Sequence, residues 1–215
     1  MSNFIDELKI FKDFKYIEKN GKIGIAEYTG TEKYIEIPSY IEEKPVVAIL
    51  DISFSSKALT GVKLPDTIIS IGSLAFANNN LEDIEFPKNL GFINLKAFEN
   101  NKLKKVVIPD SVIYIGDSAF QKNSITELTL PHKIEKINVF AFMYNELSEI
   151  HIPKNIEKIE VGAFAFNKLV NVSIDNENIN IDNLAFSNNK LDIIKVGNRT
   201  FNTNATNENF VYKFY

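Results

Sequence analysis

The sequence predicts a β-rich repeat solenoid, in which 22-residue coils contribute parallel strands joined by short helical or 3₁₀ turns. Three observations lead to this fold class. A Phe recurs every 22 residues from Phe54 to Phe186, several apolar columns share that period, and no insertion interrupts the register. A constant period of this length is typical of solenoids, because each unit is too small to bury its apolar face without its neighbours.

Columns of like residues define the repeat. The Phe column is Phe54, Phe76, Phe98, Phe120, Phe142, Phe164 and Phe186, and Ala precedes all but the first. The Ile column is Ile49, Ile71, Ile93, Ile115, Ile137, Ile159 and Ile181. The Leu column is Leu59, Leu81, Leu103, Ile125, Leu147, Leu169 and Leu191. We expect the members of each column to stack from coil to coil.

Each coil opens with a short alternating segment that predicts a strand. In the first copy, Val62 and Leu64 point inward while Gly61 and Lys63 point outward. Pro65 marks the strand end, because Pro cannot donate a hydrogen bond to a sheet. Strands that share one register in successive coils must be parallel.

An Asn column accompanies the apolar ones. Its members are Asn79, Asn101, Asn123, Asn145, Asn167 and Asn189. A buried turn leaves backbone groups that need partners, and the Asn side chain both donates and accepts. We therefore interpret the column as structural, with side chains that bond the turns and can also bond one another between coils.

The two ends of the chain depart from the repeat and predict caps, since an open solenoid would expose two apolar faces. Residues 1–37 predict an N-terminal cap, with an amphipathic helix through Phe4, Leu8 and Phe11 followed by a β-hairpin. The hairpin turns at Asn20-Gly21, a pair typical of a type I′ turn. The helix is expected to pack on the protein, with a membrane-surface or partner helix as the alternative.

The solenoid itself is expected over residues 38–196, in about seven repeats. Residues 197–215 predict a C-terminal cap, whose apolar residues fold back over the last coil. These residues are Phe210, Val211, Tyr212, Phe214 and Tyr215.

Composition excludes several classes of function. A net charge of −4 gives no polybasic surface, so a nucleic-acid partner is not expected. No apolar run reaches the roughly 18 residues of a membrane span, and the chain has no Cys. The N-terminus alternates apolar with charged residues and so does not resemble a signal peptide.

Signs of catalysis are nearly absent. His132 and His151 have no second set of ligands at zinc spacing, and no nucleophile elbow, P-loop or dinucleotide motif occurs. The sequence therefore predicts no enzyme, no catalytic residues, no metal and no cofactor.

The outward residues of the strands are one candidate binding surface, because they vary while the inward columns do not. The strand-face candidates are Asp83, Glu85, Lys105, Glu127, Thr129, Glu149 and His151. Glu127, Glu149 and His151 lie on adjacent coils and form an acidic cluster, which could bind a basic segment or weakly bind a cation. Ordinary surface charge is the alternative.

Aromatic residues form a second candidate. The residues of this predicted aromatic patch are Phe140, Met143, Tyr144 and Phe166, in columns that elsewhere hold Lys, Ser, Gln or Asn. Tyr144 and Phe166 share a column and should stack; Phe92 and Tyr114 share another. Exposed aromatics mark contacts with protein or glycan, although terminal segments or a second copy of the chain could equally cover them.

The repeat resembles the BspA-type, or type 5, bacterial leucine-rich repeat. Residues 103–123 match its pattern nearly position for position, with the sequence LKKVVIPDSVIYIGDSAFQKN, and residues 36–54 resemble its longer first repeat. The Gly of its Ile-Gly pair is present only at Gly72 and Gly116. The resemblance implies a leucine-rich-repeat solenoid and a location at the cell surface or outside the cell, although the N-terminal residues as given do not resemble a signal peptide.

We therefore expect a non-catalytic module that binds a protein or a glycan, with adhesion as the role that the family implies. The alternative is an intracellular structural or assembly protein that self-associates through a solenoid end or the aromatic patch. In either case we expect a monomer or weak self-association.

Overall fold

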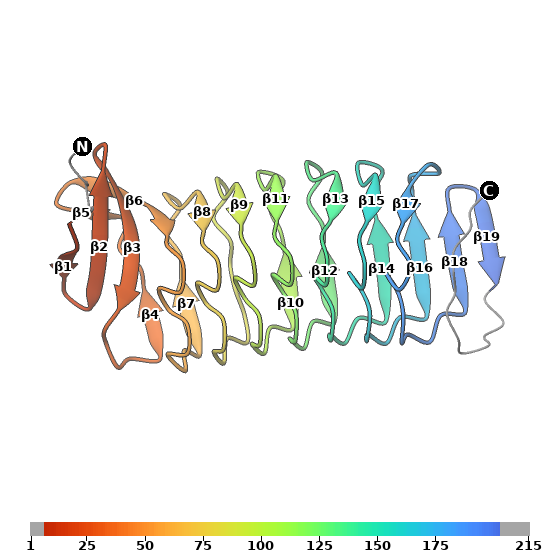
Figure 1. Ribbon diagram of the computed structural model, residues 1–215, viewed down its shortest axis with the longest axis horizontal. Helices are drawn as coiled ribbons and strands as arrows, with labels where there is room; N and C mark the ends of the chain where they lie inside the picture. The colour runs from red at the N-terminus through yellow and green to blue at the C-terminus, as the bar shows by residue number, and fades with distance from the viewer. Residues whose placement is uncertain (1–6, 203–215) are drawn as a thin grey trace, which may run out of the picture.

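In the computed structural model, residues 7–202 are described and form a β-solenoid of about eight turns, which confirms the predicted fold class (Figure 1). The coils follow one another along the long axis, with the N-terminal strands at one end and β18 and β19 at the other. None of the described residues forms a helix that could cross a lipid bilayer.

Nineteen strands build the described chain. The N-terminal strands are β1 (Lys9–Phe11), β2 (Phe14–Lys19), β3 (Lys22–Tyr28), β4 (Tyr34–Glu36), β5 (Tyr40–Ile41) and β6 (Lys44–Ile49). The first row of solenoid strands is β7 (Gly61–Lys63), β10 (Lys105–Val107), β12 (Glu127–Thr129), β14 (Glu149–Ile152), β16 (Asn171–Ile174) and β18 (Ile193–Val196). The second row is β8 (Ser70–Ile71), β9 (Phe92–Ile93), β11 (Tyr114–Ile115), β13 (Lys136–Ile137), β15 (Lys158–Ile159) and β17 (Asn180–Ile181). The last strand is β19 (Arg199–Asn202).

Strands within each row pair in parallel with a register of one repeat. Lys105 lies opposite Glu127 in the first row, and Ile93 lies opposite Ile115 in the second. The first row is interrupted: β4 pairs β7, β10 pairs β12, and β14, β16, β18 and β19 form a separate sheet. Residues 81–87 form no strand, although Ile84 and Phe86 are buried as the alternation predicts.

The Phe column is a continuous stack of rings through the core. Neighbouring ring centroids lie between 5.0 Å and 5.5 Å apart from Phe54 to Phe186, and their planes are nearly parallel. Tyr28 of β3 stacks on Phe54 at 5.7 Å and extends the stack into the N-terminal strands. Each ring is thus shielded from water by the coils on either side of it.

The Asn column bonds the turns, as predicted. Asn145 donates to the carbonyls of Phe120 (2.9 Å) and Phe142 (3.1 Å), while its Oδ1 accepts the amide hydrogen of Ile125 (3.0 Å). The same three contacts recur at the other members. Within residues 7–202, the Asn side chains of this column form hydrogen bonds with backbone groups and not with one another. The backbone groups occupy the donors and acceptors that bonds between Asn side chains would need.

The predicted helical or 3₁₀ turns are wrong: the turns around the Ala-Phe pair are hydrogen-bonded turns without helix. Two residues in each turn have left-handed φ, as at Ser118 (55°) and Lys122 (56°), and a right-handed helix cannot pass through such residues. The turn amides bond the next coil instead: Phe120 N–H donates to the carbonyl of Ala141 at 2.9 Å. Hydrogen bonds to the next coil therefore take the place of the hydrogen bonds that a helix would form within the turn.

The N-terminal segment is a set of strands. β2 and β3 pair antiparallel around Asn20 and Gly21, whose φ values of 52° and 69° suit a type I′ turn. Residues 9–11, predicted to be part of an amphipathic helix, form β1 on the edge of β2 instead. A single short helix is only marginally stable, whereas β2 offers hydrogen-bond partners to the backbone of residues 9–11.

Ion pairs also connect these strands. Glu18 binds Lys44 (2.8 Å) and Lys9 (2.9 Å), and both ammonium groups lower the pKa of the Glu18 carboxyl. Residues 1–6 lie outside the described residues.

At the other end, β19 turns back at Gly197 (φ 56°) and pairs antiparallel with β18. The predicted fold-back of Phe210, Val211, Tyr212, Phe214 and Tyr215 lies outside the described residues.

Replacing Asn145 by Ala should lower the free energy of unfolding by about 3 kcal/mol or more, since the buried amide of Ile125 and two carbonyls lose their partner. Urea unfolding followed by circular dichroism measures this change. Asn89→Ala, at an exposed position, serves as the control and should change stability by less than about 0.5 kcal/mol. Equal effects of the two variants would contradict the structural role of the Asn column.

Candidate binding site on the strand face

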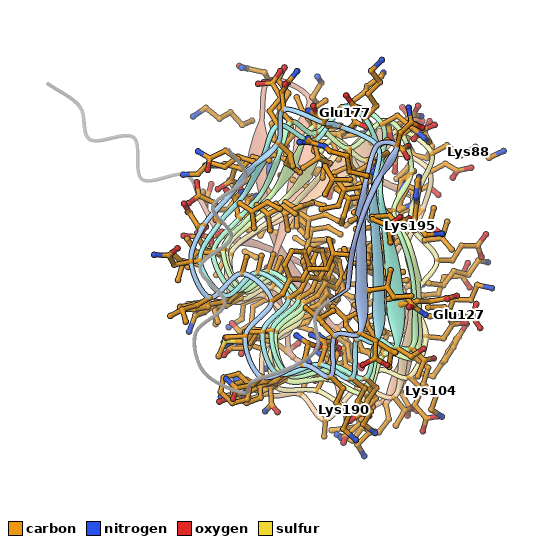
Figure 2. The ribbon with its side chains drawn as sticks, turned by 90° about the vertical axis from the view of Figure 1, so that its right-hand side faces the viewer. Lys88, Lys104, Glu127, Glu177, Lys190 and Lys195 are labelled. Atoms are coloured by element: carbon orange, nitrogen blue, oxygen red, sulfur yellow. The ribbon has the colours of Figure 1, made fainter. Side chains whose placement is uncertain are left out.

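The strand-face candidates project from the first row of strands. Figure 2 shows Glu127 and Lys195 projecting from the same side of the solenoid. Lys105, Glu127 and Thr129 belong to β10 and β12, and Glu149 and His151 belong to β14. Asp83 and Glu85 lie in residues 81–87, which form no strand, two coils before β12.

A hollow of about 730 Å³ lies over β12, β14, β16 and β18. It brings together four of the strand-face candidates, Glu127, Thr129, Glu149 and His151. Asp83, Glu85 and Lys105 are not part of its lining. The hollow spans the interruption between β12 and β14, where the two strands are not paired. It is therefore a depression over four coils.

The hollow also contains residues that the sequence did not single out. Asn171 and Ser173 contribute from β16, and Ile193 and Lys195 from β18. Their outward direction follows from the strand alternation, but alternation predicts the same direction in every coil. The sequence therefore carried no signal that these four coils surround a depression.

The predicted acidic cluster is partly neutralised. Lys105 pairs with Glu127 at 2.8 Å, and the Glu127 carboxylate raises the pKa of the Lys105 ammonium. Glu149 makes no ion pair within residues 7–202. The hollow thus has one unpaired carboxylate, Glu149, and one ammonium, Lys195, on opposite sides of neutral polar residues.

His151 is held between two neighbours on the next coil. Its Nδ1 lies 2.9 Å from Ser173 Oγ, and its Nε2 lies 3.2 Å from Asp175 Oδ2. The three residue types are those of a hydrolase triad, yet the His151 side chain is 61% exposed. Preorganised catalytic electrostatics depend on excluding water, and a side chain this exposed does not provide that exclusion.

No three His, Asp or Glu side chains within residues 7–202 come together as metal ligands. The weak cation site considered from the sequence therefore lacks a ligand set in this part of the chain.

The predicted aromatic patch divides into exposed and half-buried parts. Tyr144 and Phe166 stack at 4.5 Å between ring centroids, as expected, and both are exposed. Phe140 and Met143 are half-buried. The Phe140 ring lies over Gly162, where an added Cβ would meet it at 2.5 Å. Within the predicted aromatic patch, the Tyr144–Phe166 pair is thus the exposed part.

The backbone of this pair is unusual for aromatic residues. Tyr144 and Phe166 have φ values of 57° and 55°, in the left-handed region that disfavours bulky side chains. The same position holds Asn78, Asn100 and Asn188 in other coils, also at positive φ. The fold thus imposes the left-handed backbone conformation at this position, whichever residue occupies it. Aromatic side chains occupy it only in these two coils.

A family model described as the BspA-type leucine-rich repeat region, in six copies, matches residues 47–167 and 91–211. No curated protein matches the chain.

Several solved structures are similar. A leucine-rich cell surface protein of Faecalibacterium prausnitzii is 26% identical with a TM-score of 0.63, over 82% of this chain and 56% of that one. A leucine-rich repeat protein of Bacteroides capillosus is 29% identical with a TM-score of 0.50, over 57% of this chain and 99% of that one. The pneumococcal vaccine antigen PcpA shares the fold. It is 18% identical with a TM-score of 0.65, over 92% of this chain and 54% of that one. The chain thus spans about half the length of the first of these proteins.

Replacing both Tyr144 and Phe166 by Asn should change the free energy of unfolding by no more than about 1 kcal/mol. The lost ring stacking, about 0.5–1.5 kcal/mol, is offset because Asn tolerates left-handed φ better. Chemical denaturation tests this, with the buried Phe142→Ala as a comparison that should lose about 3–5 kcal/mol. A loss as large as that of Phe142→Ala would mean that the pair holds the fold together.

Proposed function

Because the chain belongs to the BspA-type leucine-rich repeat family, we propose that it is a non-catalytic module that binds a protein or a glycan through the hollow on its strand face. The observation that supports this most is the hollow itself. It gathers varied outward residues from four coils over inward columns that stay apolar, such as Leu128, Ile150 and Val172. A rigid frame with a variable surface is what recognition requires, since little ordering accompanies binding.

The lining suits a ligand with both polar and apolar parts. Thr129, Asn171 and Ser173 offer neutral donors and acceptors, while Leu128 and Ile193 add apolar surface. A few polar groups on apolar walls are typical of selective sites. Glu149 and Lys195 add one charge of each sign, which favours a ligand without a large net charge.

We extend the proposal to a role in adhesion. This role is supported by the similarity to a structure described as a leucine-rich cell surface protein. Self-association through a solenoid end or the Tyr144–Phe166 pair is a second candidate, favoured by the exposure of two stacked aromatics.

Asn171→Arg should weaken binding at least tenfold, because the larger charged side chain fills the hollow. Binding of the intact chain is measured on a glycan array, and by biolayer interferometry against a panel of purified matrix glycoproteins. Asn180→Arg is the matched control: it makes the same change at an exposed Asn, on β17 of the second row. Binding that survives Asn171→Arg, or falls equally in both variants, would place recognition elsewhere.

Ser173→Ala should leave ester hydrolysis unchanged, because the exposed His151 does not activate the Ser173 hydroxyl. Release of p-nitrophenol from p-nitrophenyl acetate measures this, with free imidazole as the reference. Saturable turnover that disappears in Ser173→Ala would show an enzyme and overturn the non-catalytic proposal.

A further inference from the structure

The outer side of the second row carries a group of exposed apolar side chains near β8, β9 and β11. This second-row patch comprises Ile69, Phe92, Leu95, Ile113 and Tyr114, each between 42% and 52% exposed. The columns of Ile113 and Tyr114 continue as Glu135 and Lys136, then Glu157 and Lys158. Because those coils fold with charged residues there, the fold does not require an apolar surface at this place.

The patch has a defined shape. Gly91 lies between Ile69 and Ile113 in one column: its N–H donates to the Ile69 carbonyl at 2.9 Å, and its carbonyl accepts from Ile113 N–H at 2.9 Å. A Cβ on Gly91 would meet only the Ile69 carbonyl oxygen, at 3.6 Å. Gly91 is therefore a notch between two Ile side chains. Phe92 and Tyr114 lie beside it in register.

The size of the patch suits the centre of a protein interface. Five large apolar residues, each about half exposed, present roughly 400 Å² of apolar surface, at the scale that marks interaction sites. A stable interface buries about 800 Å² on each partner, with an apolar centre and a polar rim. The charged coils that follow the patch supply such a rim on one side.

We propose that the second-row patch docks a second copy of this chain, with the two solenoid axes antiparallel. The two-fold axis runs between β9 and β11, parallel to those strands. This symmetry places Ile113 in the notch at Gly91 of the partner subunit and Phe92 against Tyr114 of the partner subunit. An isologous interface makes each of these contacts twice.

The geometry also suits the rim. The same two-fold places Ser70 opposite Lys136 of the partner subunit, so a hydroxyl meets an ammonium and no charges of like sign face each other there. The same two-fold places Ile69 opposite Glu135 of the partner subunit and Leu95 opposite Asp117 of the partner subunit. The apolar match is therefore confined to the centre of the interface, where Ile113 meets the notch and Phe92 meets Tyr114.

The dimer does not depend on the function proposed for the hollow. Both rows of strands direct their buried columns into one core, so their exposed residues face different sides of the solenoid. The two hollows of the dimer would stay open, and two linked sites raise the apparent affinity for a multivalent ligand without a new contact.

Analytical ultracentrifugation of the intact chain tests the interface. The wild type should shift with concentration from 24.4 kDa toward twice that mass, whereas Ile113→Asp should stay monomeric. Val107→Asp is the matched control, because Val107 is equally exposed but lies on β10 of the first row, and it should dimerise like the wild type. A wild type that is monomeric at every concentration, or an Ile113→Asp dimer, would overturn the proposal.

A complementation experiment tests the register. Gly91→Lys fills the notch and should also be monomeric, since the site is open and its backbone is not left-handed. An equimolar mixture of Gly91→Lys with Ile113→Asp should associate again, because the ammonium then faces the carboxylate across the interface. Circular dichroism confirms that each variant is folded. A mixture that stays monomeric would overturn the proposed register and with it the dimer.

Discussion

Each coil of this protein is shielded from water only by the coils next to it. The stacked Phe rings make that dependence visible, because each ring has the same ring above and below it. The Asn column applies the same rule to polar groups, since each side chain bonds its own turn and the turn of the preceding coil. Both interactions require equal lengths of neighbouring coils, so that residues 22 apart lie side by side.

The same constraint divides the surface from the core. The inward strand columns stay apolar and differ only in size and shape, as Leu64, Phe86 and Ile108 do in one column, so charged residues are placed at outward positions. Ion pairs between neighbouring coils, such as Lys105–Glu127 and Lys104–Glu82, take up many of the outward charges. Exposed pairs of this kind contribute little to stability. Because Glu127 is paired with Lys105, the polar surface of the hollow comes mainly from Glu149 and the neutral residues around it.

The proposed function and the proposed dimer use different sides of one frame. The first row carries the hollow, which spans β12 and β14, two strands that are not paired with each other. The second row carries the apolar patch around Gly91, in the coils that come before the hollow along the chain. A solenoid can hold two such surfaces independently, because each coil contacts only its neighbours and a change in one coil is not transmitted far.

The sequence by itself determined the period, the inward columns, the role of Asn145 and its equivalents, and the stacking of Tyr144 on Phe166. These were predictable because a fixed period makes residues 22 apart spatial neighbours, so contacts between coils can be read along the chain. Only the tertiary structure decided that the turns are not helical, that residues 9–11 join a sheet, and that Asn171 and Lys195 share a hollow with Glu149. These features depend on which backbone groups of the adjacent coil are within reach and on where strand pairing fails. A repeating pattern of residue types is nearly the same in every coil, so it does not encode such differences between coils.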